Sequence, residues 1–192
     1  MNTMTQQNET YTGINSYRML MWFAMVSMFM IFAGYTSGYI VRMGDGAWTV
    51  FQMPTQFLYS TLVILVSSFF MQWAVFAAKK NQIDTIKTTL MITLLLGFVF
   101  VLLQFLGWKD MTSRNLFFVA NDPSSSFVYV ITGVHLAHLL GGIIYLIYVN
   151  VGAVREKYSA TNYFAITQAA LYWHFLGALW TYLYLFFVLT AN

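Results

Sequence analysis

The three histidines of the chain, His135, His138 and His174, have the residue type and spacing best suited to chemistry. All of them lie within residues 133–189, in two long stretches that are joined by a short charged segment. On an α-helix, residues three apart share one face, so His135 and His138 would point the same way. Imidazole nitrogens bind zinc and copper. A site of three histidines would form if His174 approached this pair from the second stretch.

Other features of the sequence favour a structural role for these histidines. A haem held by two histidines needs one on each side of its ring, which a pair three residues apart on one helix does not supply. A di-iron site needs carboxylates from several helices, and these stretches contain none. We therefore expect no catalytic residue, metal or cofactor on this chain. We expect the histidines to hydrogen-bond to neighbouring helices or lipid head groups, as polar side chains do in membrane proteins.

Small and aromatic residues near the histidines indicate close helix packing. Gly142 follows His135 by seven residues and therefore shares its face. Gly133, Ala137 and Gly141 are four apart, a spacing along which another helix can approach closely. In the second stretch, one face is expected to carry four residues: Trp173, Gly177, Trp180 and Tyr184.

The composition requires that most of this chain lie in lipid. Hydrophobic residues make up 59% of it and charged residues only 8%, against about a quarter in soluble domains. The charge-free runs are residues 19–41, 46–78, 88–108, 123–154 and 158–192, and each exceeds the roughly 20 residues that a spanning helix needs. The sequence predicts an all-α membrane protein, a bundle of five transmembrane helices. Their expected ranges are 17–41, 55–78, 86–108, 127–154 and 163–189.

Basic residues between the spans predict the orientation. Residues 1–15 are expected to form a polar N-terminal tail, and residues 16–192 the transmembrane domain. Six basic residues fall on one side, Arg18, Lys79, Lys80, Lys87, Arg155 and Lys157, and three on the other, Arg42, Lys109 and Arg114. By the positive-inside rule, the N-terminus is cytoplasmic and the C-terminus lies outside.

The interiors of the predicted spans contain no Asp, Glu, Lys or Arg. Ion and proton pathways usually contain such groups, so this absence argues against a carrier or channel. Gln72 and Gln104 lie near the ends of their spans, where we expect them to reach water. The net charge of +3 belongs to loops that flank the membrane, so we expect no nucleic-acid partner.

Five segments resemble subunit III of the haem–copper terminal oxidases, the family of cytochrome c and quinol oxidases. GVHLAHLLGG resembles the family's Gly-x-His-x-x-His segment, here Gly133, His135 and His138. LYWHFLGALW resembles its Tyr-Trp-His-Phe segment followed by Trp, here Tyr172, Trp173, His174, Phe175 and Trp180. Weaker matches occur at residues 27–34, 53–74 and 93–104. The resemblance extends from about Arg18 to the C-terminus, with the segments in the family's order.

This resemblance implies a short, five-helix bacterial subunit III in the cytoplasmic (inner) membrane. Such a subunit packs beside subunit I, which holds the haems and copper, in a complex that also contains subunit II. It supports subunit I during oxygen reduction and proton pumping, binds phospholipid that helps oxygen approach, and can belong to a respiratory supercomplex. The residues expected to pack spans four and five and to contact lipid or subunit I are Gly133, His135, His138, Gly142, Tyr172, Trp173, His174 and Trp180.

Two positions depart from the family pattern. Many members carry a glutamate where this chain has Met28, and mitochondrial-type members carry an aspartate at the position of Gly177. The roles of those carboxylates do not transfer. The larger family form has seven spans, of which the first two have no counterpart among the five predicted here.

Two alternatives remain open from the residues alone. One is a small membrane carrier or channel, which would transport a solute when reconstituted by itself. The other is a membrane metalloenzyme that uses the three histidines. Both differ from an oxidase subunit in not requiring a haem-bearing partner.

Overall fold

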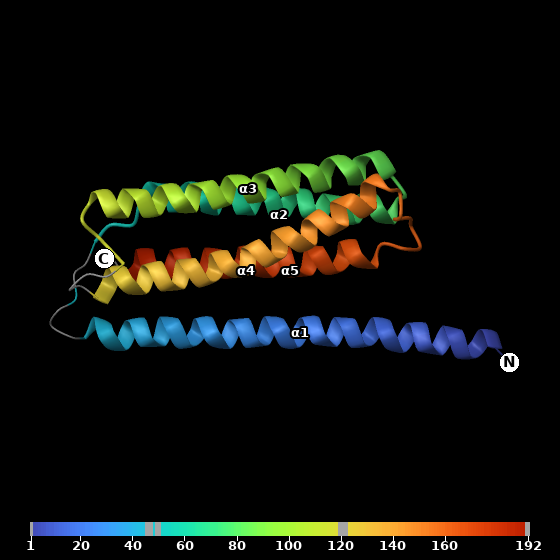
Figure 1. The fold of residues 1–192 in the computed structure, drawn as a ribbon, viewed down its shortest axis with the longest axis horizontal. Coiled ribbons are helices and arrows are strands. Elements are labelled where there is room, and N and C mark those ends of the chain that lie inside the picture. The colour runs from blue at the N-terminus through green and yellow to red at the C-terminus, as the bar shows by residue number, and fades with distance from the viewer. Residues whose placement is uncertain (1, 45–47, 49–50, 119–122, 191–192) are drawn as a thin grey trace.

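The fold of this chain is a bundle of five long helices, seen in a computed structural model that describes residues 2–44, 48, 51–118 and 123–190, with side chains from residue 16 onward (Figure 1). The helices are α1 (Asn2–Met43), α2 (Thr55–Lys79), α3 (Ile83–Ser113), α4 (Pro123–Val154) and α5 (Phe164–Thr190). The predicted all-α class and the number of long helices are confirmed.

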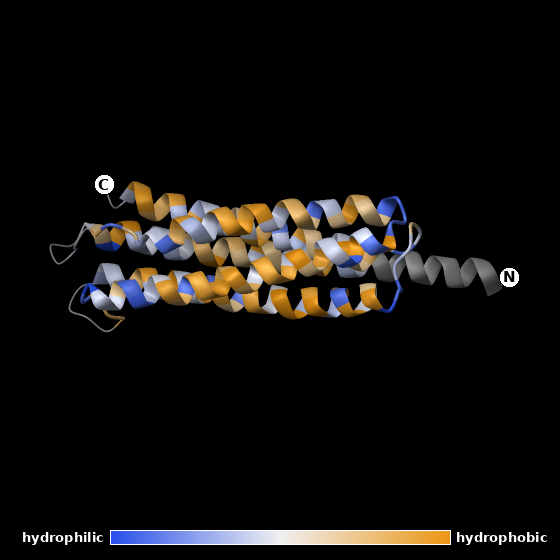
Figure 2. Cartoon of the chain, turned by 90° about the horizontal axis from the view of Figure 1, so that it is seen from above, coloured by the Kyte–Doolittle hydropathy of each residue, from blue (hydrophilic) through white to orange (hydrophobic). Residues whose placement is uncertain are grey.

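All five helices are long and apolar enough to cross a membrane. In α1 the candidate span is Ser16–Met43, and in the other four it is the entire helix. At 1.5 Å per residue, the 25 residues of α2 extend about 38 Å, which exceeds the roughly 30 Å hydrocarbon core. Figure 2 shows hydrophobic residues along the middle of the bundle and hydrophilic residues gathered near its ends.

The helices are arranged as two pairs and a peripheral helix. α2 packs on α3, and α4 and α5 lie between this pair and α1 (Figure 1). Among the described residues, α1 contacts α4 and α5 but neither α2 nor α3. Within an apolar 18-residue window of each span, only 17% of the residues of α1 are buried in the described chain, against 44% in α2 and in α4. Most of α1 is therefore available to lipid or to a partner.

The backbone of α1 is helical from Asn2 onward, so residues 2–15 continue the first span as one helix. The side chains of residues 1–15 lie outside the part of the chain that the structure describes. The proposed boundary between a tail of residues 1–15 and a domain of residues 16–192 stays a prediction.

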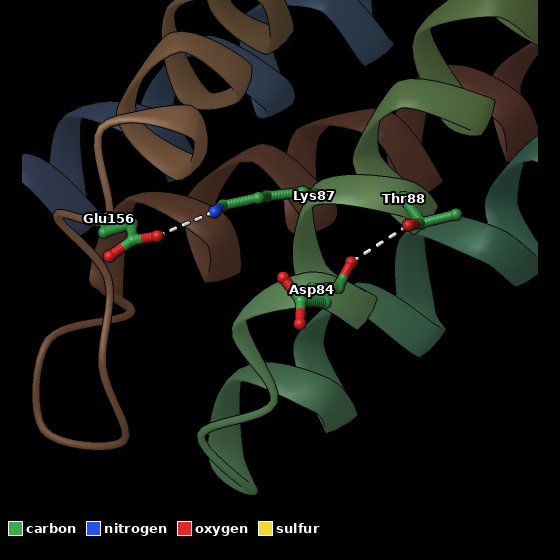
Figure 3. Close-up of polar contacts among 4 residues, drawn as sticks. All are labelled: Asp84, Lys87, Thr88 and Glu156. Carbon is green, nitrogen blue, oxygen red and sulfur yellow. Dashed lines mark hydrogen bonds and ion pairs between the residues drawn. The ribbon is translucent and has the colours of Figure 1, made fainter.

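The two short connections at the end of the bundle where α1 begins are tied together by polar contacts. Lys87 Nζ lies 2.9 Å from Glu156 Oε1, which joins α3 to the α4–α5 connection (Figure 3). The backbone N–H of Ala160 donates to Asn81 Oδ1 at 3.1 Å, which joins this connection to the α2–α3 turn. Asn81 has a φ of 56° and follows the last turn of α2, the position where helices often end in a left-handed residue.

Large aromatic side chains fill the centre of the bundle. The largest fully buried side chains include six aromatic residues that come from α1, α2, α3 and α5: Phe32, Phe57, Phe100, Trp173, Trp180 and Phe187. This aromatic core surrounds the residues that the two sequence motifs contribute.

Candidate helix-packing and subunit-contact site

Two tryptophans of α5 donate hydrogen bonds to α2. Trp173 Nε1–H donates to Ser67 Oγ at 3.0 Å, and Trp180 Nε1–H donates to Thr61 Oγ1 at 3.0 Å. Each indole is only 1% exposed, and a buried N–H without a partner is strongly unfavourable. The two bonds therefore fix the position of α5 along the antiparallel α2.

His135 lies inside a cage of aromatic rings. Its side chain is fully buried, with ring centroids 6.2 Å from Phe32 of α1, 6.1 Å from Phe100 of α3 and 5.1 Å from Trp180 of α5. Neither ring nitrogen has a hydrogen-bond partner among the described residues. The expectation that His135 hydrogen-bonds to a neighbouring helix is therefore wrong. Within this chain, His135 joins three helices to α4 by ring packing.

His138 and Tyr172 connect α4 with α5 through the backbone. His138 Nδ1 lies 2.8 Å from the carbonyl oxygen of Val134, and because a carbonyl oxygen only accepts, Nδ1 carries the proton. The Tyr172 hydroxyl donates to the carbonyl oxygen of His138 at 3.1 Å. Phe32 packs against the His138 ring at 5.9 Å between centroids, so both histidines of α4 share this contact with α1.

His174 is engaged by a different helix. Its Nε2 lies 3.2 Å from Gln72 Oε1 of α2, and the amide oxygen accepts the bond. Because His174 pairs with α2 and His135 is enclosed by rings, the three histidines do not converge. In the searched part of the chain, no three His, Asp or Glu side chains form a group that could hold a metal ion.

Several polar partners were not predicted from the sequence. Gln104 is fully buried, and its Nε2 donates to Ser60 Oγ of α2 at 3.0 Å. The expectation that Gln104 reaches water at a span end is therefore wrong. Gln72 is partly exposed and bonds to His174 of α5, so its contact with water stays a prediction. Trp108 Nε1–H donates to Thr132 Oγ1 of α4 at 3.0 Å. One available signal was the seven-residue spacing of Ser60 and Ser67, which places both on the face of α2 that accepts bonds from Gln104 and Trp173.

The glycines of the first motif have different surroundings. A Cβ atom added to Gly142 would lie 3.1 Å from Leu176 and 3.1 Å from Tyr172, so α5 comes close there. A Cβ added to Gly133 or Gly141 would meet nothing within 4 Å. The close approach predicted along Gly133, Ala137 and Gly141 is therefore not made by any described helix of this chain.

Comparisons with known proteins identify the family to which this chain is similar. A model of the cytochrome c oxidase subunit III family matches residues 6–191. The probable cytochrome c oxidase subunit 3 of Mycobacterium tuberculosis (strain ATCC 25618 / H37Rv) is 31% identical over 166 residues, which cover 82% of this chain and 80% of the relative. Cytochrome c oxidase subunit 3 of Corynebacterium diphtheriae is 26% identical over 163 residues, or 81% of this chain and 79% of the relative.

A longer relative shows which part of the family this chain covers. Cytochrome c oxidase subunit 3 of Gadus morhua is 30% identical over 135 residues, which cover 70% of this chain but 49% of the fish protein. The family match includes both histidine motifs and all five helices. The chain belongs to the cytochrome c oxidase subunit III family.

Proposed function

We propose that this chain is the non-catalytic, integral membrane subunit III of a respiratory haem–copper oxidase. The observation that carries the proposal is that the family's motif residues contact other helices of this same chain. Trp173 and Trp180 donate to α2, and His135 is enclosed by rings of the chain's own helices. These side chains hold the helices of the chain to one another and are occupied by contacts within the bundle.

In this proposal the redox centres belong to partner chains. Subunit I, with subunit II, carries the haems and copper and reduces oxygen to water with coupled proton pumping. This chain stabilises subunit I from the side and provides a lipid-facing surface through which oxygen reaches it. Its exposed apolar residues, which cover most of α1, suit contact with both lipid and a partner's helices. Gly133 and the neighbouring open face of α4 are a candidate contact with subunit I.

The proposed location is a bacterial cytoplasmic membrane, with the N-terminus inside and the C-terminus outside. Six of the nine Lys and Arg residues flank the end of the bundle that would then face the cytoplasm, as the positive-inside rule requires. Membership of a larger respiratory supercomplex is compatible with so much exposed apolar surface.

Co-purification tests this proposal directly. The chain is tagged at its N-terminus, extracted in a mild detergent and purified, and the absorption spectrum and metal content of the product are measured. We expect haem and copper to co-purify with the tagged chain and to be assigned to other polypeptides. Recovery of the chain alone from cells that contain an active oxidase, or a metal bound to this polypeptide itself, would contradict the proposal.

A further inference from the structure

A pocket of about 350 Å³ lies at the end of the bundle where α4 is connected to α5. We call it the α4–α5 pocket. It combines cationic side chains with tyrosine rings, and its lining includes Tyr148, Gly152, Arg155, Lys157, Tyr158 and Asn162. Sites for small molecules typically have apolar or aromatic walls and a few polar groups that fix the ligand. This combination makes the pocket a candidate binding site.

The pocket lies at the edge of the hydrocarbon core or outside it. The 32 residues of α4 extend about 48 Å, so with α4 centred about 9 Å of the helix projects beyond each side of a roughly 30 Å core. That projection corresponds to about six residues, so Tyr148 lies at the boundary and Arg155 lies outside it. A water-soluble ligand can therefore enter the pocket. In the orientation proposed above, this end faces the cytoplasm.

The way in which α4 ends brings two cations to the pocket. The Glu156 N–H donates to the Ala153 carbonyl at 3.0 Å, and the Lys157 N–H donates to the Gly152 carbonyl at 3.0 Å. This is the Schellman pattern of a helix end, and Glu156 has the left-handed φ of 54° that it requires. The turn reverses the chain so that Arg155 and Lys157, on either side of Glu156, both line the pocket.

The charge in the pocket is positive. Glu156 Oε1 lies 2.9 Å from Lys87 Nζ of α3 (Figure 3), so the carboxylate of this turn is already paired. Among the described residues, no Asp or Glu lines the pocket, and neither Arg155 nor Lys157 takes part in an ion pair. Guanidinium and ammonium groups form strong hydrogen bonds with phosphate oxygens. The pocket therefore favours an anion with several oxygen atoms.

The Tyr158 hydroxyl adds an enclosed donor. Tyr158 is only 9% exposed, and a Cβ added to Gly152 would lie 2.5 Å from its Oη, so the ring fits because residue 152 has no side chain. Within the described chain this hydroxyl forms no hydrogen bond. Burial raises the pKa of Tyr158 to about 12, so the hydroxyl can donate at neutral pH. Enclosed polar groups normally have partners, and a ligand oxygen would supply one here.

Tyr148 and Asn162 provide a flat surface and an acceptor. The Tyr148 ring is 67% exposed and stacks on Tyr145, with centroids 6.2 Å apart and planes inclined by 16°. Asn162 Nδ2 donates to the carbonyl oxygen of Lys157 at 3.1 Å, which leaves the amide oxygen available to a ligand N–H. Flat heterocycles stack on exposed aromatic rings. These two residues therefore suit a heterocycle that is attached to the anion.

We propose that the α4–α5 pocket binds a small soluble phosphomonoester that carries a flat heterocycle, of about the size of a nucleoside monophosphate. The phosphate contacts Arg155, Lys157 and the Tyr158 hydroxyl, and the heterocycle lies against Tyr148. The bound ligand joins the end of α4 to the connection that leads to α5. This inference goes beyond the proposed function and does not depend on which oxidase subunits surround the chain.

The experiment uses the complex that is purified through the tagged chain in a neutral detergent. Equilibrium dialysis measures the binding of radiolabelled adenosine monophosphate and, separately, of inorganic phosphate. A double variant, Arg155→Gln with Lys157→Gln, removes the two cations of the pocket. The matched control, Lys79→Gln with Lys80→Gln, removes two cations at the same end of the bundle but none from the pocket lining. Tyr148→Leu removes the ring and keeps both cations.

We expect the unaltered complex and the matched control to bind adenosine monophosphate more tightly than inorganic phosphate. Because hydrogen bonds to charged groups are the strongest available in the pocket, the pocket double variant should bind both probes at least about tenfold more weakly. Tyr148→Leu should weaken only the binding of adenosine monophosphate. Bound adenosine monophosphate should also slow hydrogen exchange in residues 155–163.

Three results would overturn the proposal. The first is equal binding of adenosine monophosphate in the two double variants, and the second is unchanged binding in Tyr148→Leu. The third is displacement of adenosine monophosphate by micelles that contain phosphatidylglycerol, which would assign the cations to a lipid head group. Haem content is measured on the same samples. Specific binding of adenosine monophosphate without haem would therefore refute the oxidase assignment and leave this site intact.

Discussion

At the scale of single residues, the two family motifs use chemically similar side chains in different ways. A ring nitrogen of His138 and one of His174 each form a hydrogen bond with an oxygen acceptor. Neither ring nitrogen of His135 has a hydrogen-bond partner among the described residues. The sequence could show that His135 and His138 share a helix face. It could not show which of them would be enclosed, because that depends on Phe32, Phe100 and Trp180 from three other helices.

Replacing His135 separates ring packing from hydrogen bonding. His135→Phe keeps an aromatic ring in the cage and removes two buried polar atoms, so we expect unchanged stability or a gain of about 1 kcal/mol. His135→Ala leaves a cavity and should destabilise the bundle by about 2–4 kcal/mol. Thermal unfolding of the purified complex measures both, and its haem spectrum should be unchanged before heating. Loss of a bound metal in His135→Phe would instead identify a ligand.

Trp180 tests the indole hydrogen bonds to α2. Trp180→Phe removes the bond to Thr61 and part of the packing against Phe57 and Phe100, so we expect a loss of about 1–3 kcal/mol. Trp22→Phe is the matched control, since Trp22 is 57% exposed and should change stability little. Both variants are compared by denaturation of the complex in detergent. Equal stability of the two would show that the bond to Thr61 does not hold α5.

At the scale of helices, the charge-free runs predicted the spans well and the helix ends poorly. The range predicted for the last span, 163–189, agrees closely with α5 (Phe164–Thr190), but the predicted 86–108 underestimates α3 (Ile83–Ser113). Backbone hydrogen bonding continues beyond the apolar segment, so α3 includes Lys109 and Asp110 in its last turns. Charge marks where a span leaves the hydrocarbon core and does not mark where the helix ends.

The sequence identified small residues at which helices could approach closely, but it did not show which of these residues contact another helix. Gly142 meets α5 closely, and Gly97, outside the motifs, meets Trp173, whose Cη2 would lie 2.9 Å from an added Cβ. Gly133 has the same spacing pattern, but a Cβ added to it meets nothing within 4 Å among the described residues. The sequence shows which helix faces are lined by small residues. The arrangement of the helices decides which of these faces is contacted by another helix of the same chain.

The two glycines of the first motif offer a matched pair of substitutions. Gly142→Leu would push Leu176 and Tyr172 away, so we expect separation of α4 from α5 and a severalfold lower yield of assembled complex. A Cβ at Gly133 meets no described atom within 4 Å, so we expect Gly133→Leu to leave the fold of this chain intact. Circular dichroism and size-exclusion chromatography compare the variants. If Gly133→Leu folds but no longer recovers the haem-bearing partner, Gly133 lies at the subunit contact, whereas a folding defect would contradict the open surroundings of this glycine.

The ion pair between α3 and the α4–α5 connection gives this end of the bundle a pH dependence (Figure 3). The Lys87 ammonium, through its hydrogen bond and its charge, lowers the pKa of Glu156. A lowered carboxyl pKa means that the stabilisation is present at neutral pH and is lost as the pH falls below about 4. Because the pair is exposed, the effect should be local and small.

We therefore expect faster hydrogen exchange in residues 155–163 under acid conditions than the general pH dependence of exchange explains. Glu156→Gln should remove this additional acid sensitivity while the helices keep their protection. Mass-spectrometric hydrogen exchange on the purified complex checks both statements. An identical acid response in the two proteins would show that the ion pair does not stabilise the connection.

At the scale of the whole molecule, the described part of the chain has five candidate spans and the sequence has no cysteine, so the orientation can be measured with single introduced cysteines. We expect a cysteine introduced at Gln82 to be labelled by a membrane-impermeant maleimide only after the cells are opened. A cysteine at Ser113, at the other end of α3, should be labelled in intact cells. The opposite pattern would place the basic end of the bundle outside and contradict the charge-based orientation.

The neighbours of α1 constrain how the protein is made. This helix is synthesised before the other four, yet in the described structure its partners are α4 and α5, which are synthesised after α2 and α3. While α2 and α3 are synthesised, α1 has none of its native helix contacts and is surrounded by lipid or by an insertion factor. The packing of the bundle around Phe32 is therefore completed late in biogenesis. If synthesis stops before α5, the released chain lacks one of the two helices that α1 contacts.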